Sequence, residues 1–178
     1  MFTGSGGKFT YLRHELSDRM VCQQTPTSCV AACVRQLLGD EGVEVSEAEI
    51  RADSNYSDES GIEFTSILNF LSNRHPLKRF QAGVPDVPGL NMVELAQKLS
   101  RDTGVWVAGI KPNNGINHSV LVDAIEGNII LVRDPWGGRT DGIGTSGAQG
   151  EMLLEYFVAC WIRGCLQSIF GFPKFMNS

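Results

Sequence analysis

The hydrophobic pattern of this chain changes its period about halfway along, and this change limits the folds available to it. In the first half, apolar residues recur at helical spacing in short segments. In the second half, the runs 105–111, 118–125 and 129–134 are rich in Val and Ile and bounded by Gly, Pro or Asn, as strands are. Gly127 and Asn128 supply a turn, which predicts an antiparallel hairpin from the last two runs. Helices followed by an antiparallel sheet predict an α+β fold.

Helices are expected in the first half, each with a recognisable start or apolar side. The run from Cys29 to Gly39 has good helix formers, and residues 62–73 contain apolar residues at helical spacing. Two further helix starts are predicted from pairs of residues that have the spacing of a capping box. The two pairs are Ser46 with Glu49, opening a helix over about 47–53, and Asn91 with Glu94, opening the helix VELAQKLSR.

Other segments are predicted to be less regular. Residues 1–20 are polar with scattered Gly, so we expect a flexible lead-in arm or a short lead-in helix without chemistry. Repeated Gly over 137–150 is expected to prevent a regular element, which leaves a mobile lid or a long loop open. A helix from Glu151 to Trp161 and a strand near 164–170 are expected to follow.

The composition is that of an ordinary globular protein. The chain has 178 residues, of which 42% are hydrophobic and 20% are charged, so we expect a single domain over 21–172. A net charge of −5, without a dense Lys/Arg stripe, argues against direct binding of nucleic acid. No apolar run is long enough to span a bilayer, and the N-terminal segment lacks a secretory-type run. A soluble protein without a membrane partner is therefore expected.

The five cysteines form an odd count with no paired spacing of the zinc-site type. This argues against a disulfide framework and against a structural zinc. A metal site built from Cys22, Cys29 and His118 lacks a close Cys or His pair to anchor it. Three cysteines are expected to be small buried apolar residues, namely Cys33, Cys160 and Cys165.

Three residues of the pattern suggest nucleophilic catalysis. Cys29 lies at a predicted helix start, where unpaired N–H groups and the helix dipole favour a thiolate. His118 begins a predicted strand that can aim its imidazole, whereas His14 lies in the arm and His75 in a loop. Asp134 ends the paired strand, so the hairpin can bring the His and Asp side chains together. Taken singly, each residue also fits a structural role, as a buried thiol, a solvated imidazole or an Asp-Pro turn.

A glutamine in the loop before the nucleophile is a candidate oxyanion donor. Gln23 is placed so that its side-chain amide could reach the same space as the Cys29 thiol and backbone N–H. Gln24 is the alternative donor. Either residue could instead be an exposed polar residue of the loop.

The combined pattern resembles a known family. The strings QQTPTSCVAACVRQLL and NHSVLVDAIEGNIILVRDPWGG, with EYFVACWIRG before the final strand, resemble papain-like peptidases that process the double-glycine leaders of bacteriocins, and their stand-alone relatives. The likeness covers roughly residues 20–170. It implies a papain-like cysteine peptidase fold, with an N-terminal helical half packed on a C-terminal antiparallel sheet.

The resemblance also implies roles for individual residues. Cys29 would be the nucleophile, His118 the base, Asp134 the orienting acid, and Gln23 an oxyanion donor together with the Cys29 amide. Neither a metal nor an organic cofactor is implied. The family commonly has Gly after the nucleophile, whereas this chain has Val30, whose side chain would narrow the groove near the thiol.

The implied activity is that of a cysteine endopeptidase, which would cleave a protein or peptide substrate, with a preference for Gly-Gly before the cleaved bond. Without a Walker-type loop or a spanning helix, the chain is expected to be a stand-alone catalytic unit. It would act in the producer's cytoplasm or, as a bacterial effector toxin with a cognate immunity protein, in the cytoplasm of a target cell. Two alternatives stay open, namely a glutamine deamidase or transglutaminase toxin and a catalytically silent peptide-binding module.

Overall fold

The computed structural model describes residues 9–137 and 146–173 and confirms the expected α+β arrangement. The elements, in chain order, are β1 (Arg13–Ser17), α1 (Cys29–Gly39), α2 (Glu47–Ala52), the 3₁₀ helix η2 (Phe64–Ile67), α3 (Leu68–Arg74), β2 (Lys78–Ala82), α4 (Met92–Thr103), β3 (Trp106–Ile110), β4 (His118–Glu126), β5 (Ile129–Asp134), β6 (Gly147–Leu153), α5 (Leu154–Arg163) and β7 (Ser168–Pro173).

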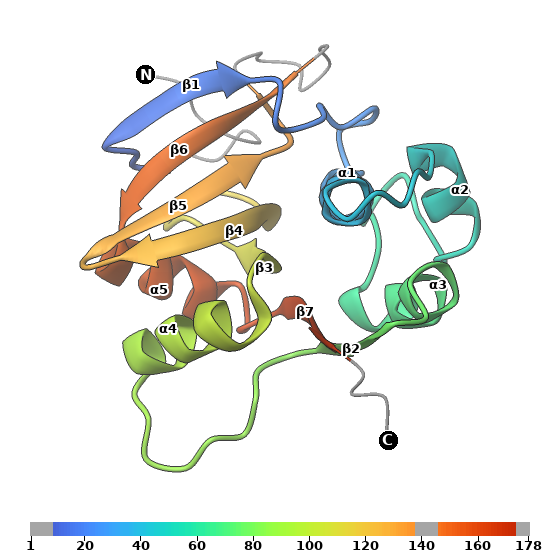
Figure 1. Cartoon of the computed structure of the whole chain (residues 1–178). Coiled ribbons are helices and arrows are strands. Elements are labelled where there is room, and N and C mark those ends of the chain that lie inside the picture. The colour runs from blue at the N-terminus through green and yellow to red at the C-terminus, as the bar shows by residue number, and fades with distance from the viewer. Residues whose placement is uncertain (1–8, 138–145, 174–178) are drawn as a thin grey trace.

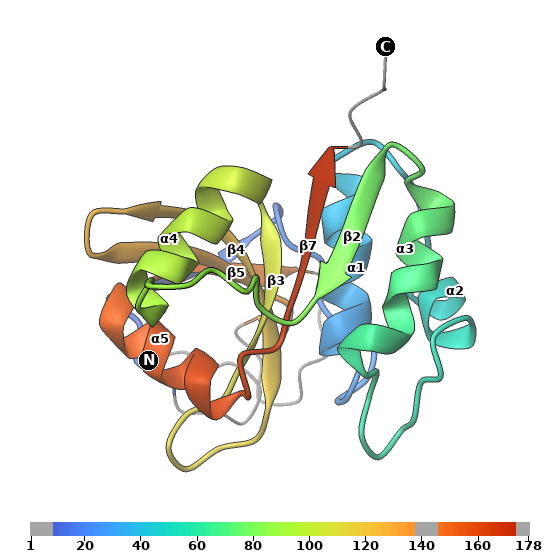
Figure 2. The same ribbon diagram turned by 90° about the horizontal axis from the view of Figure 1, so that it is seen from below.

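The strands form one antiparallel sheet in the order β1-β6-β5-β4-β3-β7-β2. Helices α4 and α5 pack against one side of it, and α1 packs against β3 and β4 from the other side (Figure 1). Helix α2 contacts α1, and α3 contacts β2, so the helical half adjoins the β7–β2 end of the sheet (Figure 2). The helices expected in the first half therefore do not form one layer, because α4 lies on the opposite side from α1.

The central strands are buried on both faces. On β3 and β4, Trp106 and Val120 belong to a core shared with α4 and α5, whereas Val107 and Leu121 belong to a core shared with α1 and α3. Strands covered on both faces are apolar at successive positions instead of alternating with polar residues. This double burial explains the continuous Val/Ile-rich runs that identified these strands in the sequence.

Several boundaries agree with the sequence analysis. Helix α1 begins at Cys29, and β4 and β5 form the expected antiparallel hairpin, with a register shift between Val122 and Ala124. Both capping boxes are present, at the starts of α2 and α4. Local start signals therefore identified these helices correctly.

The prediction of a poorly held arm or a lead-in helix over 1–20 is wrong for its described part. Arg13–Ser17 is a strand that pairs with β6, and the Phe9 side chain is buried. A Cβ on Gly150 of β6 would lie 2.5 Å from a ring carbon of Tyr11, so only glycine leaves room for the arm to cross here. An edge strand held by such close approach has no apolar periodicity for the sequence to reveal.

The glycine-rich segment also differs from its expectation. A strand begins at Gly147, and the helix expected from Glu151 begins only at Leu154 because Glu151 belongs to β6. A Cβ on Gly147 would lie 2.6 Å from the backbone oxygen of Asp134. Glycine therefore permits close strand packing here, and the expected lid or loop over 137–150 lies partly outside the described residues.

Two further strands depart from the sequence analysis. Strand β2, Lys78–Ala82, was not predicted, and it contains three polar residues among its five. The final strand begins at Ser168, later than expected, because Cys165 and Leu166 adopt positive φ angles of 60° and 54° in the preceding turn. Strands β2 and β7 pair with each other at one edge of the sheet, where tertiary contacts decide the register.

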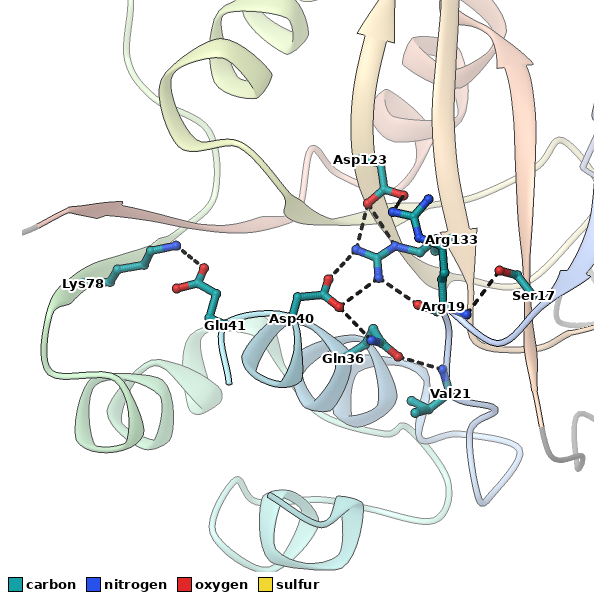
Figure 3. Close-up of polar contacts among 9 residues, drawn as sticks. All are labelled: Ser17, Arg19, Val21, Gln36, Asp40, Glu41, Lys78, Asp123 and Arg133. Carbon is teal, nitrogen blue, oxygen red and sulfur yellow. Dashed lines mark hydrogen bonds and ion pairs between the residues drawn. The ribbon is translucent and has the colours of Figure 1, made fainter. Parts of the chain in front are cut away.

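A buried arginine ties the far end of α1 to the sheet (Figure 3). Arg133 of β5 is 2% exposed, and its guanidinium bonds Asp40 at the end of α1 and Asp123 of β4, the latter at 2.9 Å. It also donates to the backbone oxygen of Arg19 at 2.8 Å. Gln36 of α1 donates to the same Asp40 carboxylate at 2.8 Å. One guanidinium thus joins α1, β4, β5 and the segment that follows β1.

Among the helices within the described ranges, none combines the length and the apolar character needed to cross a bilayer.

Candidate active site

The structure brings Cys29, His118 and Asp134 to one region of the molecule. Cys29 is the first residue of α1, His118 the first of β4 and Asp134 the last of β5. The His118 Nε2 and Asp134 Oδ1 atoms are 2.6 Å apart, and the two residues are 2% and 0% exposed. The hairpin therefore produces the His–Asp contact that its topology predicted.

The Asp134 carboxylate is held in three directions. Besides His118, its Oδ1 accepts a 2.9 Å hydrogen bond from the Trp136 N–H, and its Oδ2 accepts a 2.9 Å bond from the Tyr11 hydroxyl. Burial alone would raise the pKa of Asp134, but the interactions with His118, Trp136 and Tyr11 outweigh it and lower the pKa. The carboxyl group therefore stays ionised and orients the imidazole.

His118 and Cys29 have pKa values that favour an ion pair. Burial would lower the pKa of His118, but Asp134 and then Cys29 raise it to about 10. Burial would raise the pKa of the Cys29 thiol, yet interactions with His118 and Ser119 lower it below its ordinary value. Within the described residues, no hydrogen bond of normal geometry reaches His118 Nδ1. That nitrogen therefore remains available for proton exchange near the half-buried thiol.

Gln23 lies beside this group, and its side chain is buried. Its backbone N–H donates to the Pro135 oxygen at 2.9 Å, and its Nε2 donates to the Thr25 oxygen at 2.7 Å. An amide nitrogen carries two hydrogens, so the bond to Thr25 leaves one for a further acceptor. Gln24, in contrast, is exposed and its Oε1 accepts from Arg51 at 3.5 Å. Burial therefore favours Gln23 over Gln24 as the residue near the thiol.

Cys29 and His118 open onto a groove of about 120 Å³. Its walls combine apolar side chains with backbone and polar groups. The lining residues are Thr27, Cys29, Val30, Ser60, Ile62, Glu63, Phe64, Gly109, Asn117, His118, Ser119, Gly164 and Gln167. Gln23 is not among the residues that line this groove.

The remaining histidines occupy other positions. His14 stacks on Tyr11 with ring centroids 4.2 Å apart, and His75 pairs with Glu41 through Nε2 at 2.7 Å. His14 interacts electrostatically with Asp134, but the imidazole bonded to that carboxylate at 2.6 Å is that of His118. Their locations agree with the choice of His118 as the imidazole at the site.

The other cysteines mostly have structural surroundings. Cys33 and Cys160 are buried as predicted, and the Cys33 thiol donates to the Ser119 oxygen at 3.4 Å. The same expectation is wrong for Cys165, which is exposed because it lies in the turn before β7. Over residues 9–137 and 146–173, no three His, Cys, Asp or Glu side chains gather as a set of metal ligands.

Two residues that contact Asp134 or Cys29 were not predicted from the sequence. Tyr11 reaches Asp134 from the segment that was assigned no chemistry, and Ser119 interacts with the Cys29 thiol through its backbone and side chain. Gly150 in a strand is a weak signal of close approach, but nothing in the sequence connects it with Tyr11. Ser119 follows the predicted base directly, so its position in the chain was an available clue.

Known proteins resemble this chain in sequence or in fold. No protein-family model matches the sequence. "Cysteine protease effector 1" of Escherichia coli O1:K1:H7 is 30% identical over 139 residues, which are 76% of this chain and 25% of that protein. The chain thus spans about a quarter of the length of that curated relative.

Solved structures show the fold. The peptidase domain of Streptococcus ComA, a bifunctional ABC transporter involved in quorum sensing, has a TM-score of 0.64 at 17% identity, over 87% of this chain and 98% of that one. A double-glycine motif protease from an AMS/PCAT transporter, in complex with its leader peptide, has a TM-score of 0.62 at 15% identity, over 94% and 97%. A C39-like peptidase from Bacillus anthracis has a TM-score of 0.56 at 16% identity, over 97% and 98%. This chain therefore has the papain-like fold of the C39-like double-glycine peptidases and is related in sequence to a cysteine protease effector.

Proposed function

We propose that this chain is a cysteine endopeptidase in which Cys29, His118 and Asp134 form the catalytic triad. The observation that carries the proposal is the buried His118–Asp134 pair, joined at 2.6 Å, beside a cysteine at the start of a helix. A papain-like mechanism needs a thiolate, an imidazolium and a fixed carboxylate, and the pKa directions of these three residues favour those forms.

Acylation then follows from the arrangement. The Cys29 sulfur attacks the carbonyl carbon of the scissile peptide, and the electron pair of the carbonyl moves to its oxygen. As that intermediate collapses, His118 gives its Nδ1 proton to the leaving amine and the carbon–nitrogen bond breaks. The acyl group remains on Cys29 as a thioester, while Asp134 holds the imidazole in place.

Deacylation repeats the steps with water. His118 takes a proton from water at Nδ1, the oxygen attacks the thioester carbon, and the carbon–sulfur bond breaks. The released Cys29 thiolate again faces the imidazolium. No step requires a metal or an organic cofactor.

The developing oxyanion needs donors. We assign the Cys29 N–H, because the first N–H groups of a helix have no acceptor within that helix. The second donor is the Gln23 side-chain amide, which retains a hydrogen beyond its bond to Thr25. A small rotation of this amide toward the groove on substrate binding accompanies this role.

The groove supports a substrate with small residues next to the cleaved bond. Val30, Ile62 and Phe64 narrow it to about 120 Å³, which favours backbone and small side chains over large ones. The structural relative from the AMS/PCAT transporter is a double-glycine motif protease in complex with its leader peptide. We accordingly propose cleavage after a Gly-Gly sequence in an extended segment of a protein.

The biological setting follows from the sequence relative. Because that relative is a cysteine protease effector, we propose that this catalytic unit acts as an effector on a protein of a target cell. A protease that cleaved such a protein could also damage the cell that makes it, so we propose a cognate immunity protein as a partner.

Expression of wild type, Cys29→Ala and His118→Ala in bacterial cells tests the proposal. We expect toxicity and new protein termini after Gly-Gly with the wild type alone. Intact-protein mass separates the alternatives, because glutamine deamidation adds about one dalton while peptide hydrolysis splits the chain. New termini with His118→Ala, or a target altered by about one dalton without cleavage, would contradict the endopeptidase assignment.

A further inference from the structure

Glu47, the first residue of α2, has a buried carboxylate close to the candidate active site. It is 0% exposed, and its Oε1 and Oε2 atoms accept the Gln24 N–H at 3.1 and 3.2 Å. The Arg51 Nε lies 3.9 Å from the same carboxylate. Burial of a carboxylate is costly unless polar partners compensate, so this side chain is placed there by specific contacts.

The contact with Gln24 fixes the start of the segment before the nucleophile. We call residues 23–28 the nucleophile loop. Glu47 accepts the N–H of Gln24, whose neighbour Gln23 is the proposed side-chain oxyanion donor. Glu47 therefore holds the backbone beside one of the two proposed oxyanion donors.

The middle of the nucleophile loop is held independently. The Tyr56 hydroxyl lies 2.7 Å from the Thr25 Oγ1 and 2.8 Å from the Thr27 Oγ1. Ser28 Oγ accepts from the Thr25 N–H at 3.0 Å and donates to the Thr25 oxygen at 3.1 Å. Loss of Glu47 would therefore release the start of the loop without dissolving the rest of it.

Helix α2 does not depend on this carboxylate for its start. Its capping box joins Ser46 and Glu49, and Glu49 also pairs with Arg74 at 3.3 Å. An exposed acid in the first turn would favour the helix dipole, but Glu47 is turned into the protein instead. Its orientation toward the nucleophile loop is therefore the feature that requires an explanation.

We propose that Glu47 is a positioning residue that aligns the Gln23 oxyanion donor by accepting the Gln24 N–H at the start of the nucleophile loop. This inference rests on the proposed peptidase function. It assigns Glu47 no contact with substrate. Its effect is on the stage of the reaction where negative charge appears on the carbonyl oxygen.

Two reactions of Cys29 separate this role from a general structural one. Hydrolysis of a peptide spanning the cleavage site found in cells passes through an oxyanion. Alkylation by iodoacetamide needs the thiolate but forms no oxyanion. A variant that misaligns an oxyanion donor should therefore slow hydrolysis while leaving alkylation nearly unchanged.

Glu47→Asp keeps the charge, but its side chain is too short to reach the Gln24 N–H. Glu47→Gln keeps the length and one acceptor oxygen. We expect Glu47→Asp to lower kcat by about 10- to 100-fold, with alkylation changed by less than about threefold. Glu47→Gln should stay within about fivefold of wild type in both reactions. Glu49→Ala is the matched control, because it weakens the start of α2 without touching the loop, and it should change kcat by less than about threefold.

The inference is overturned if hydrolysis and alkylation fall together in Glu47→Asp, if neither falls, or if Glu49→Ala reproduces the effect. Should Glu47→Asp not fold, Glu47→Gln decides the matter. Equal losses of kcat and of the Cys29 alkylation rate in that variant would show a structural role. If wild-type Cys29 is alkylated but the protein cleaves no peptide, the proposed function is contradicted. If the wild type cleaves the peptide and Glu47→Asp cleaves it equally fast, only this inference is contradicted.

Discussion

The two ends of α1 are both held by buried ionisable groups, but the groups are used differently. At the C-terminal end, the Arg133 guanidinium meets two carboxylates, Asp40 and Asp123, so the buried charge is fully compensated. At the N-terminal end, Cys29 faces the His118 imidazole, in an arrangement whose charge can change during a reaction. The first arrangement stabilises the fold, whereas the second, under the proposed function, keeps a reactive thiolate available.

The largest expected effect concerns the reactive end. Cys29→Ala should lower hydrolysis by at least about 10⁴-fold, because it removes the atom that forms the covalent intermediate. The thermal midpoint should shift little, since the change removes one partly exposed atom. Turnover and thermal unfolding measured on the same preparation test both statements. A variant that keeps a tenth of wild-type turnover would show that another group is the nucleophile.

The next effect combines rate and pH. Asp134→Asn should lower hydrolysis by about 10² to 10⁴-fold, because the imidazole loses its orienting carboxylate. In the wild type, hydrolysis should decline as the pH rises through about 10, since His118 then loses the proton that the leaving amine needs. Asp134 raises that pKa, so the asparagine variant should lose activity at lower pH. An alkaline limb that does not move would argue against His118 as the proton donor.

At the opposite end of α1, the expected effect is on stability. Arg133→Met leaves Asp40 and Asp123 without their common partner, and breaking a buried ion pair costs about 3–5 kcal/mol. The folded fraction should keep kcat within about threefold of wild type. Arg13→Met is the matched control, because Arg13 is exposed and its pair with Glu15 is screened by solvent, so little stability should be lost. Denaturant unfolding measures the loss of stability in each variant. An Arg133→Met protein with wild-type stability but low kcat would show that this end of α1 serves catalysis instead of stability.

The smallest effect concerns the segment before β1. Tyr11→Phe removes the hydroxyl that donates to Asp134 at 2.9 Å but keeps the aromatic ring over Gly150. We expect a two- to tenfold loss of kcat and a loss of stability of about 1 kcal/mol. The pKa of Asp134 should rise, because one of the groups that lower it is gone. Unchanged kinetics would show that His118 and the Trp136 N–H suffice to hold the carboxylate.

Much of the site was predictable because its residues lie where elements begin and end. Cys29 follows a helix-start signal, and the short hairpin makes the approach of His118 and Asp134 a matter of local geometry. Tyr11 was not predictable, since it joins Asp134 across most of the sequence. Glu47 looked like an ordinary acid in the first turn of a helix, and only its burial distinguishes it.

The sequence by itself determined the starts of α1, α2 and α4, the central apolar strands and the hairpin, because each depends on residues close together in the chain. Only the tertiary structure decided that Arg13–Ser17 becomes an edge strand and that Gly147 and Gly150 lie in β6. Those outcomes depend on strand pairing and on space between segments that are distant in sequence. The same holds for the charges at the two ends of α1, because burial and the partners brought together by folding set their pKa values.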